Sequence, residues 1–339
     1  MLTNISTPKA AIYAVLTILV GVIIMQTVSS VTFLSLLTQA IIYAMLALSV
    51  GFLLKQNGMV SFGQALYSGA TGYVIGILLQ AKIVDAELAI LVAIVAIAIA
   101  SILIGLVIVR IPGVAFSMLT LAIGQMLYLT VSRTRGVIGG VDGINIEWPS
   151  HLFGTSISII LKPANIFIIS LLALVATIFI LSLLLRSRYG AVTEAVRDNE
   201  ERARFIGITT LLPRALIYAA SALIAAVSGV LSSLNSGFVS PESLHWGLSG
   251  TALMMAIVGG YNVLWGPVLG AIVYFLVKDA LGDFSSHWMA IFGLALIAVI
   301  VLSPAGIAGA IERTMQTQKL SAFDRFGLAR LKRGLRRHG

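Results

Sequence analysis

Side chains that could carry out acid–base, metal or nucleotide chemistry are few in this sequence, and none lies in the middle of an apolar segment. The 339 residues include 13 acidic residues and 4 histidines but no cysteine. A proton- or ion-coupled pump normally holds a carboxylate within the membrane, and no candidate is present. The chain also lacks the G-x-x-x-x-G-K-[ST] loop that cradles nucleotide phosphates. We therefore expect no catalytic residue, metal or cofactor on this chain, which is not an enzyme, so energy for uphill transport must come from another subunit.

Ten of the 35 charged residues lie instead in a long polar stretch between two apolar segments, residues 186–214. Its part from Ala191 to Phe205 contains good helix formers and no internal Gly or Pro, which predicts a helix. Asp198 is a suitable N-cap for the second half of this helix, and Gly207 is a suitable stop. A helix that projects from a membrane protein could dock in the groove of a soluble partner, or its arginines could hold it on anionic lipid. The residues alone leave both interpretations open.

Glycines and small polar residues form a second group of interest. Irregular backbone is tolerated within a membrane only where it faces protein or a water-filled cavity, so a solute path is one interpretation. Packing is the other, because glycines let helices approach closely, as in the G-x-x-x-G pairs at 72–76 and 266–270. The candidates for the solute path are Ser61, Gln64, Ser68, Gly259, Gly260 and Asn262.

The composition shows which elements must position these residues. Apolar types make up 59% of the chain, charged types 10%, and the mean hydropathy is +1.04. A soluble domain has about 25% charged residues, so this is an integral membrane protein, and a spanning helix needs about 20 apolar residues. Five windows meet this requirement without an ionisable residue: 10–29, 33–54, 88–109, 164–185 and 215–235. Four are weaker (59–80, 113–131, 264–282 and 288–303), and the short run 248–260 either crosses or is a re-entrant half-helix. The prediction is an all-α, polytopic transmembrane helical bundle of about ten spans, with nine as the alternative.

The distribution of basic residues predicts the orientation of the bundle. Lys and Arg accumulate in cytoplasmic loops. With the N-terminus inside and ten crossings, seventeen of the 22 Lys and Arg fall on the cytoplasmic side, including six in 186–214. We therefore expect both termini in the cytoplasm, a transmembrane domain over 1–310 and a basic cytoplasmic tail over 311–339.

Several motifs resemble the LivM-type permeases, the membrane subunits of bacterial ABC importers for branched-chain amino acids. Within 186–214, the pattern Glu201-x-Ala203-x-x-x-Gly207 is similar to the E-A-A-x-x-x-G signature that such permeases present to their ATPase, with Arg202 in place of the middle alanine. The tract 61–65 resembles the family's S-F-G-H-A, with Gln64 replacing His. Further matches lie in order at 139–144, 237–243, 264–271 and 304–306, so the resemblance runs from about residue 30 to 310.

The resemblance implies a permease subunit that pairs with a second, LivH-type permease in the bacterial inner membrane. Two cytoplasmic ATPase subunits would bind ATP and Mg²⁺, and a periplasmic binding protein would deliver the solute. The implied ATPase-coupling residues are Arg197, Asp198, Glu201, Ala203 and Gly207, on a coupling helix over 191–207.

Loops 132–163 and 236–247 would receive the binding protein, through Asp142, Glu147 and Glu242. Branched-chain amino acids are the expected solutes, with urea, short amides and aromatic acids as alternatives within the same machinery. A stand-alone secondary transporter is the alternative from a different class.

Overall fold

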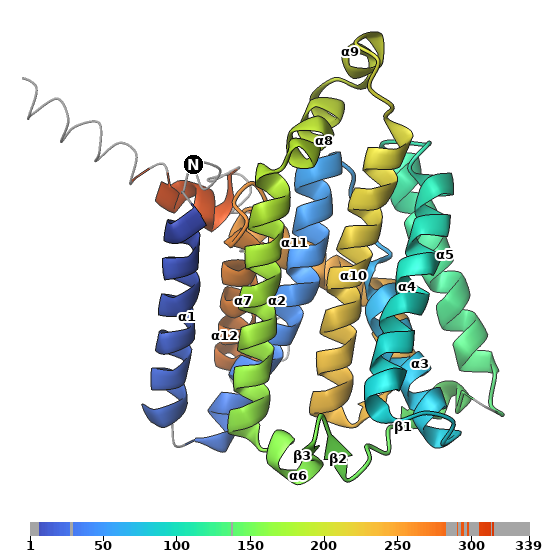
Figure 1. Cartoon of the computed structure of the whole chain (residues 1–339), viewed down its shortest axis with the longest axis vertical. Helices are drawn as coiled ribbons and strands as arrows, with labels where there is room; N and C mark the ends of the chain where they lie inside the picture. Colours follow the sequence, from blue (N-terminus) through green and yellow to red (C-terminus); the bar gives the residue numbers. More distant parts are fainter. Residues whose placement is uncertain are drawn as a thin grey trace, which may run out of the picture.

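The computed structural model describes residues 7–27, 30–136 and 138–282, followed by 290, 293–294, 297, 305–312 and 314. These residues form a bundle of long, roughly parallel and antiparallel helices (Figure 1). The long helices are α1 (Thr7–Thr27), α2 (Val31–Asn57), α3 (Gln64–Gln80), α4 (Ala86–Ile108), α5 (Val114–Arg133), α7 (Pro163–Arg186), α10 (Leu211–Ser236), α11 (Trp246–Gly259) and α12 (Gly266–Gly282).

Five of these helices, α2, α4, α5, α7 and α10, are long and apolar enough to cross a membrane. The predicted windows 33–54, 88–109, 164–185 and 215–235 lie within α2, α4, α7 and α10 to within a residue at their ends. Most of the tenth predicted span, 288–303, and nearly all of the 311–339 tail lie outside the described residues. The helical class is therefore confirmed, whereas the number of spans stays a prediction.

The two ends of the bundle differ. At one end, the short helices α8 (Arg188–Asp198) and α9 (Glu200–Phe205) project beyond the other helices, and we call this the α9 end (Figure 1). Lys55 lies there because its carbonyl oxygen accepts a hydrogen bond from Arg197. Arg110 lies there too, because it follows the end of α4 by two residues and Gly105 of α4 packs against Ala215 near the start of α10. The structure thus gathers at one end the described basic residues that the sequence assigns to the cytoplasm.

The opposite end, which we call the β end, carries the short strands and the helix α6 (Ile157–Ile160) (Figure 1). Strand β1 (Ile144–Asn145) pairs antiparallel with β4 (Phe238–Val239), and β2 (His151–Leu152) pairs with β3 (Thr155–Ser156). The first pairing joins two loops that are about ninety residues apart in the sequence. Both belong to the predicted surface for a binding protein.

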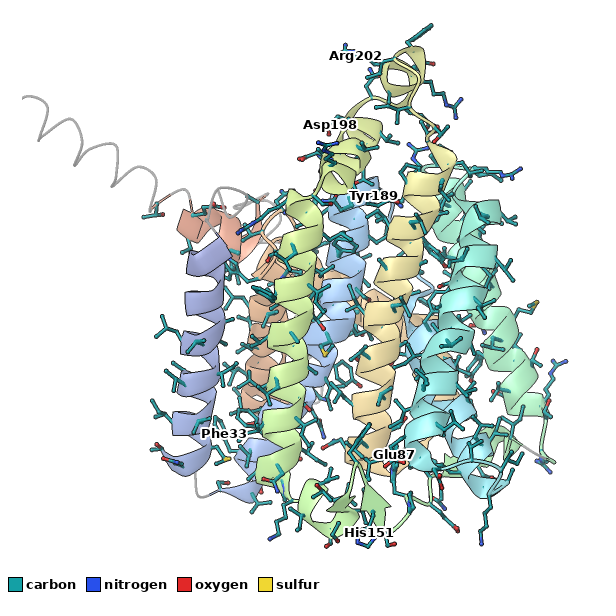
Figure 2. The ribbon with its side chains drawn as sticks, viewed as in Figure 1. Phe33, Glu87, His151, Tyr189, Asp198 and Arg202 are labelled. Carbon is teal, nitrogen blue, oxygen red and sulfur yellow. The ribbon has the colours of Figure 1, made fainter. Side chains whose placement is uncertain are left out.

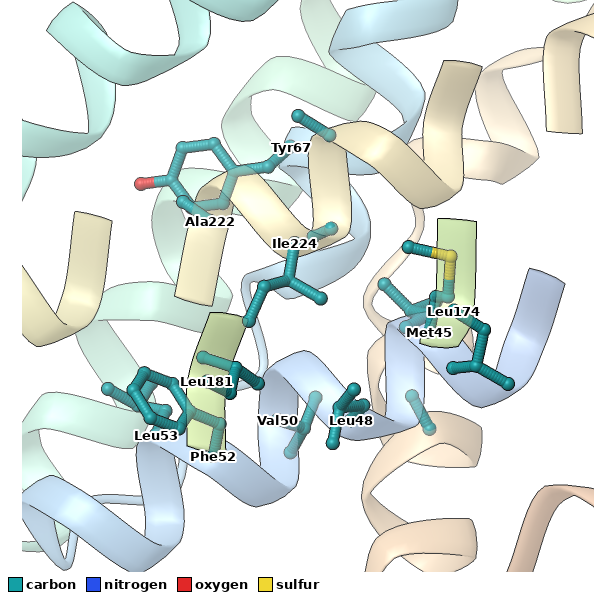
Figure 3. Packing of buried hydrophobic residues seen from close by; sticks show 14 of the residues in the cluster. Met45, Leu48, Val50, Phe52, Leu53, Tyr67, Leu174, Leu181, Ala222 and Ile224 are labelled. Carbon is teal, nitrogen blue, oxygen red and sulfur yellow. The ribbon is translucent and has the colours of Figure 1, made fainter. Parts of the chain in front are cut away.

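The core lies between α2 and α10, with α3, α4, α7 and α11 packed around them (Figure 3). Because few polar side chains compete there, hydroxyl groups bond to backbone carbonyls: Ser221 donates to Ser49 (2.7 Å) and Ser228 to Ile42 (2.8 Å). The hydroxyls of Tyr67 and Tyr218 bond to each other at 2.8 Å, and both residues are buried. These contacts hold the middle of α10 against α2 and α3.

Helix α3 begins inside the bundle, not at its surface. Gly58, with a φ of 65°, ends α2, and the chain is non-helical until Gln64. The side chain of Asn57 donates to the carbonyl oxygen of Arg214, so Asn57 lies at the same depth in the bundle as Arg214. Ser68 lies against Gly229, which is fifteen residues further along α10 towards the β end. At about 1.5 Å per residue, Gln64 therefore lies about 16 Å below the level of Asn57. A hydrocarbon layer is about 30 Å thick, so α3 starts about half-way across, and the predicted helical span 59–80 is wrong over its first five residues.

Helix α11 begins at the same depth as α3. The hydroxyl oxygen of Ser249, in its first turn, accepts a hydrogen bond from the backbone N–H of Ala65 at 2.8 Å. From there α11 runs towards the α9 end, where Ala256 and Pro267 both face Gly51 of α2. The run 248–260 thus forms a half-length helix of the bundle, preceded by the 3₁₀ helix η3 (Pro241–Leu244).

Candidate coupling site and solute path

The polar stretch 186–214 forms two helices, α8 and α9, and not the single helix predicted over 191–207. The break is at Asn199, whose backbone is extended (φ −158°, ψ 100°). Its side-chain oxygen accepts a hydrogen bond from the N–H of Arg202 at 2.8 Å, so Asn199 is the N-cap of α9. The predicted N-cap, Asp198, is the last residue of α8. The side chain of Asn199 bonds to a nearby backbone N–H and so stabilises a break in the helix, an effect that helix propensity alone does not predict.

Helix α8 is attached to the end of α2. Thr193 donates to the side-chain oxygen of Gln56 at 2.8 Å, and both residues are buried. Arg197 donates to the carbonyl oxygen of Lys55 at 2.6 Å while its guanidinium also binds Asp198. These contacts bring the two predicted residues Arg197 and Asp198 together, and they fix the position of α8.

Helix α9 is attached to the start of α10 through Glu200. One carboxylate oxygen of Glu200 accepts from Arg214 at 2.5 Å, and the other accepts from Arg204 (2.5 Å) and Thr210 (3.0 Å). The Arg214 side chain is only 9% exposed and that of Glu200 24% exposed. Burial by itself would raise the pKa of Glu200, but hydrogen bonds from Thr210 and Arg214, with the charges of Arg214 and Arg204, hold that pKa below its usual value. The ionised carboxylate is therefore the group that joins α9 to the bundle.

A third attachment lies beneath α8. The hydroxyl of Tyr189 donates to the carbonyl oxygen of Pro213 at 3.0 Å. Burial raises the pKa of Tyr189 to about 12, so the hydroxyl stays protonated and remains a donor at any physiological pH. Together the three attachments make α8 and α9 a well-supported projection (Figure 2).

The outer surface of α9 combines charge with exposed apolar groups. Glu201 and Arg202 are exposed, and Phe205 and Ile206 are 89% and 71% exposed. Ala203 is buried. Gly207 has a φ of 84° and ends the helix in a Schellman motif, in which the N–H of Ile208 bonds to Ala203 and that of Gly207 to Arg204. The predicted stop at Gly207 is therefore confirmed.

The sequence interpretation did not identify Glu200 and Arg214 as partners. Arg214 was counted only as one of the basic residues of the stretch, although it lies directly after Pro213 at the start of an apolar span. An arginine at such a position must either extend to the surface or be paired. That requirement is the signal that points to Glu200.

The predicted binding-protein surface lies on the β end. Asp142, Glu147 and Glu242 are all exposed there, and the pairing of β1 with β4 brings their loops together. The glycines around Asp142 are required by the backbone: Gly139 and Gly143 both have positive φ, and a Cβ on Gly139 would lie 1.9 Å from the carbonyl oxygen of Gly143.

The candidates for the solute path separate into two groups. Ser61, Gln64 and Ser68 are buried together at the start of α3, and both polar atoms of the Gln64 amide are buried without a hydrogen-bond partner among the described residues. Gly259 and Gly260 lie at the turn between α11 and α12, where they approach the backbone of Gly266 and Ala305 closely, which supports packing. Asn262 is exposed in the same turn.

Among the described residues, no group of three or more His, Cys, Asp or Glu could hold a metal ion. The site's geometry provides mechanical attachment and polar contact, with an exposed helix tip at one end and a buried amide at mid-depth.

Residues 32–302 match the family described as "Branched-chain amino acid transport system / permease component". The chain belongs to this permease family. The match covers the chain from the start of α2 to beyond the end of α12, including α8, α9 and the β end. The chain is therefore a membrane permease of the type found in ABC importers, and such permeases work with ATPase subunits and a solute-binding protein.

Individual relatives are distant. The "high-affinity branched-chain amino acid transport system permease protein LivM" of Escherichia coli is 23% identical over 290 residues, covering 80% of this chain and 68% of the relative. The "autoinducer 2 import system permease protein LsrC" of Salmonella paratyphi B is 27% identical over 208 residues, covering 57% of this chain and 60% of the relative. LsrC of Yersinia enterocolitica is 28% identical over 225 residues, covering 63% and 58%. No solved structure matches the chain.

Proposed function

We propose that this chain is one of two non-identical permease subunits that form the solute path of an ABC importer for branched-chain amino acids. A LivH-type permease is the second subunit, two ATPase subunits bind at the α9 end, and a periplasmic binding protein delivers the solute at the β end. ATP and Mg²⁺ are bound by the ATPase subunits. The complex lies in the bacterial inner membrane with both termini of this chain in the cytoplasm.

The observation that carries this proposal is the anchored projection with an apolar tip. Phe205 is 89% exposed on a helix that Glu200 ties to Arg214. An exposed aromatic side chain on a positioned helix suits a hydrophobic groove on a partner. Glu201 and Gly207, which match the coupling signature, lie on the same short segment. Closure of an ATPase dimer around the tip would then move α10 through Glu200 and α2 through Arg197.

The solute is the part of the proposal on which this chain bears least, because selection is expected mostly in the binding protein. LivM relatives are named for branched-chain amino acids and LsrC relatives for autoinducer 2. Urea, short amides and aromatic acids are the alternative solutes. In a stand-alone secondary transporter, uptake would persist under ATP depletion and follow a proton gradient.

Co-purification of the tagged chain from membranes tests the assembly. We expect the wild-type chain to retain ATPase subunits and the Phe205→Asp variant to lose them, since a carboxylate cannot enter an apolar groove. Phe153→Asp is the matched control, because Phe153 is 72% exposed at the β end. Retention of the ATPase by Phe205→Asp would contradict the docking assignment, and the solute held by a co-purified binding protein would identify the substrate.

A second variant tests transmission. Replacing Glu201 with Trp should abolish ATP-dependent uptake while leaving membrane insertion intact. Uptake at the wild-type rate would refute the coupling role of α9.

A further inference from the structure

The strongest unassigned feature is a polar site at mid-depth, where the first turns of α3 and α11 meet. Both helices begin inside the bundle, α3 after the non-helical segment 58–63 and α11 after the 3₁₀ helix η3. The hydrogen bond from Ala65 to Ser249 sets their N-termini side by side. Half-length helices whose N-termini lie near the bilayer midplane commonly contribute to solute sites in transporters.

The electrostatics of the site favour a negative group. The N-terminus of a helix carries about half a positive charge from its unsatisfied N–H groups. Two such ends lie at the same depth here. Gly63, the N-cap of α3, has no side chain with which to cap it. One N–H of each helix is already bonded, that of Ala65 to Ser249 and that of Gly247 to His245, and the other N–H groups of the two first turns remain for a ligand. Residues 56–84 and 243–278 contain no Asp or Glu, and Glu242, which precedes α11, is exposed at the β end.

An independent observation points to a ligand. Gln64, the first residue of α3, is fully buried, yet neither its amide nitrogen nor its amide oxygen has a partner among the described residues. A buried amide without partners costs about 1–3 kcal/mol, so its retention at this position needs a reason. Ser68 lies one helical turn further along the same face of α3, and Ser61 precedes it.

We propose that the first turns of α3 and α11, with Gln64 and Ser68, form a subsite that hydrogen-bonds the carboxylate of a passing solute. The amide N–H of Gln64 donates to the carboxylate, and the two helix ends stabilise its charge. The subsite rests on the proposed function in that it lies on the transport path. It adds a chemical requirement on the solute, namely an anionic group.

Because the chain has no cysteine, single introduced cysteines can test the subsite in the assembled complex. Gln64→Cys and Ser68→Cys are exposed, during ATP turnover, to an anionic reagent, sulfonatoethyl methanethiosulfonate, and to a cationic one, trimethylammonioethyl methanethiosulfonate. Modification of this chain is read by mass spectrometry. Asn262→Cys, in the exposed turn between α11 and α12, corrects for the intrinsic reactivity of the two reagents.

We expect the anionic reagent to be favoured at Gln64→Cys and Ser68→Cys by about tenfold relative to Asn262→Cys, the effect of two helix ends acting together. Ser68→Cys preserves both the size of the side chain and the Gln64 amide, so it serves where Gln64→Cys does not fold. A cationic preference, an equal preference, or no reaction at either site while Asn262→Cys reacts would each overturn the subsite. A complex that hydrolyses ATP and imports solute while both cysteines stay inert refutes only the subsite, whereas a chain that purifies without an ATPase refutes the proposed function.

Discussion

Removing the charge of Glu200 should release α9 from the bundle without unfolding the protein. In Glu200→Gln, the side chain keeps its shape and can still accept a hydrogen bond from Thr210, but Arg214 loses its counter-charge. Breaking a fully buried ion pair costs about 3–5 kcal/mol, whereas an exposed pair contributes about 0–1 kcal/mol. Arg214 is 9% exposed and Glu200 is 24% exposed, so we place the loss at about 2 kcal/mol, between these limits.

Hydrogen exchange measured by mass spectrometry on the chain in nanodiscs reads this loss directly. A loss of about 2 kcal/mol corresponds to roughly 30-fold less protection, and it should be confined to peptides that cover α9. The control is Glu201→Gln, which removes the neighbouring, exposed carboxylate. Its exchange should stay within about threefold of the wild type, because surface substitutions of this kind change stability by about 0.5 kcal/mol or less.

A third variant separates the pair from a general effect of the substitution. Adding Arg214→Met to Glu200→Gln removes the unpaired guanidinium and should restore part of the protection, because replacing both members of a buried pair is tolerated better than replacing one. Equal exchange in Glu200→Gln and Glu201→Gln would refute the reasoning, since Glu200 would then be an ordinary surface residue.

Three further outcomes are expected. Two arginines and Thr210 outweigh the effect of burial and hold the pKa of Glu200 below its usual value. The attachment of α9 should therefore be constant above about pH 5 and should weaken only as the pH falls through that lowered pKa. The mobility of a spin label on α9 measures this attachment. Gly229→Ala should destabilise the bundle by about 1–3 kcal/mol, because the added Cβ would lie 2.2 Å from a carbonyl oxygen of α3. Gly250→Ala is the comparison: a Cβ there would have no neighbour within 4 Å, so the variant should be more stable than the wild type by up to about 1 kcal/mol. Thermal unfolding of both variants in the same detergent measures the difference. Tyr67→Phe and Tyr218→Phe should each cost about 1–2 kcal/mol by leaving the other hydroxyl unpaired, and the double variant should cost less than their sum in a thermal double-mutant cycle.

The apolar helices could be predicted closely because their signal is local. Window 164–185 differs from α7 by one residue at each end, and 215–235 lies within α10. The start of α3 was missed because Met59 and Val60 continue an apolar run, and only the αL conformation of Gly58 and the packing of Gly63 against Thr120 show where the helix cannot form.

The candidate site was predictable in position but not in its attachments. The sequence indicated a helix near 191–207 and its end at Gly207. It did not show that Asn199 divides the helix, because side-chain capping competes with propensity in a way that composition does not reveal. The pairing of Glu200 with Arg214 closes a loop of fourteen residues, and the pairing of Asn145 with Phe238 joins two-residue strands. Neither has a periodic pattern that a sequence could display.

The pairing of β1 with β4 restricts how the β end of this protein can change shape. Ile146 also donates its N–H to the carbonyl oxygen of Gly237 at 2.8 Å, so backbone hydrogen bonds join the loop after α5 to the loop after α10. A hinge between these two loops is therefore excluded while those bonds persist. Any change of shape at the β end therefore moves these two loops together as one unit.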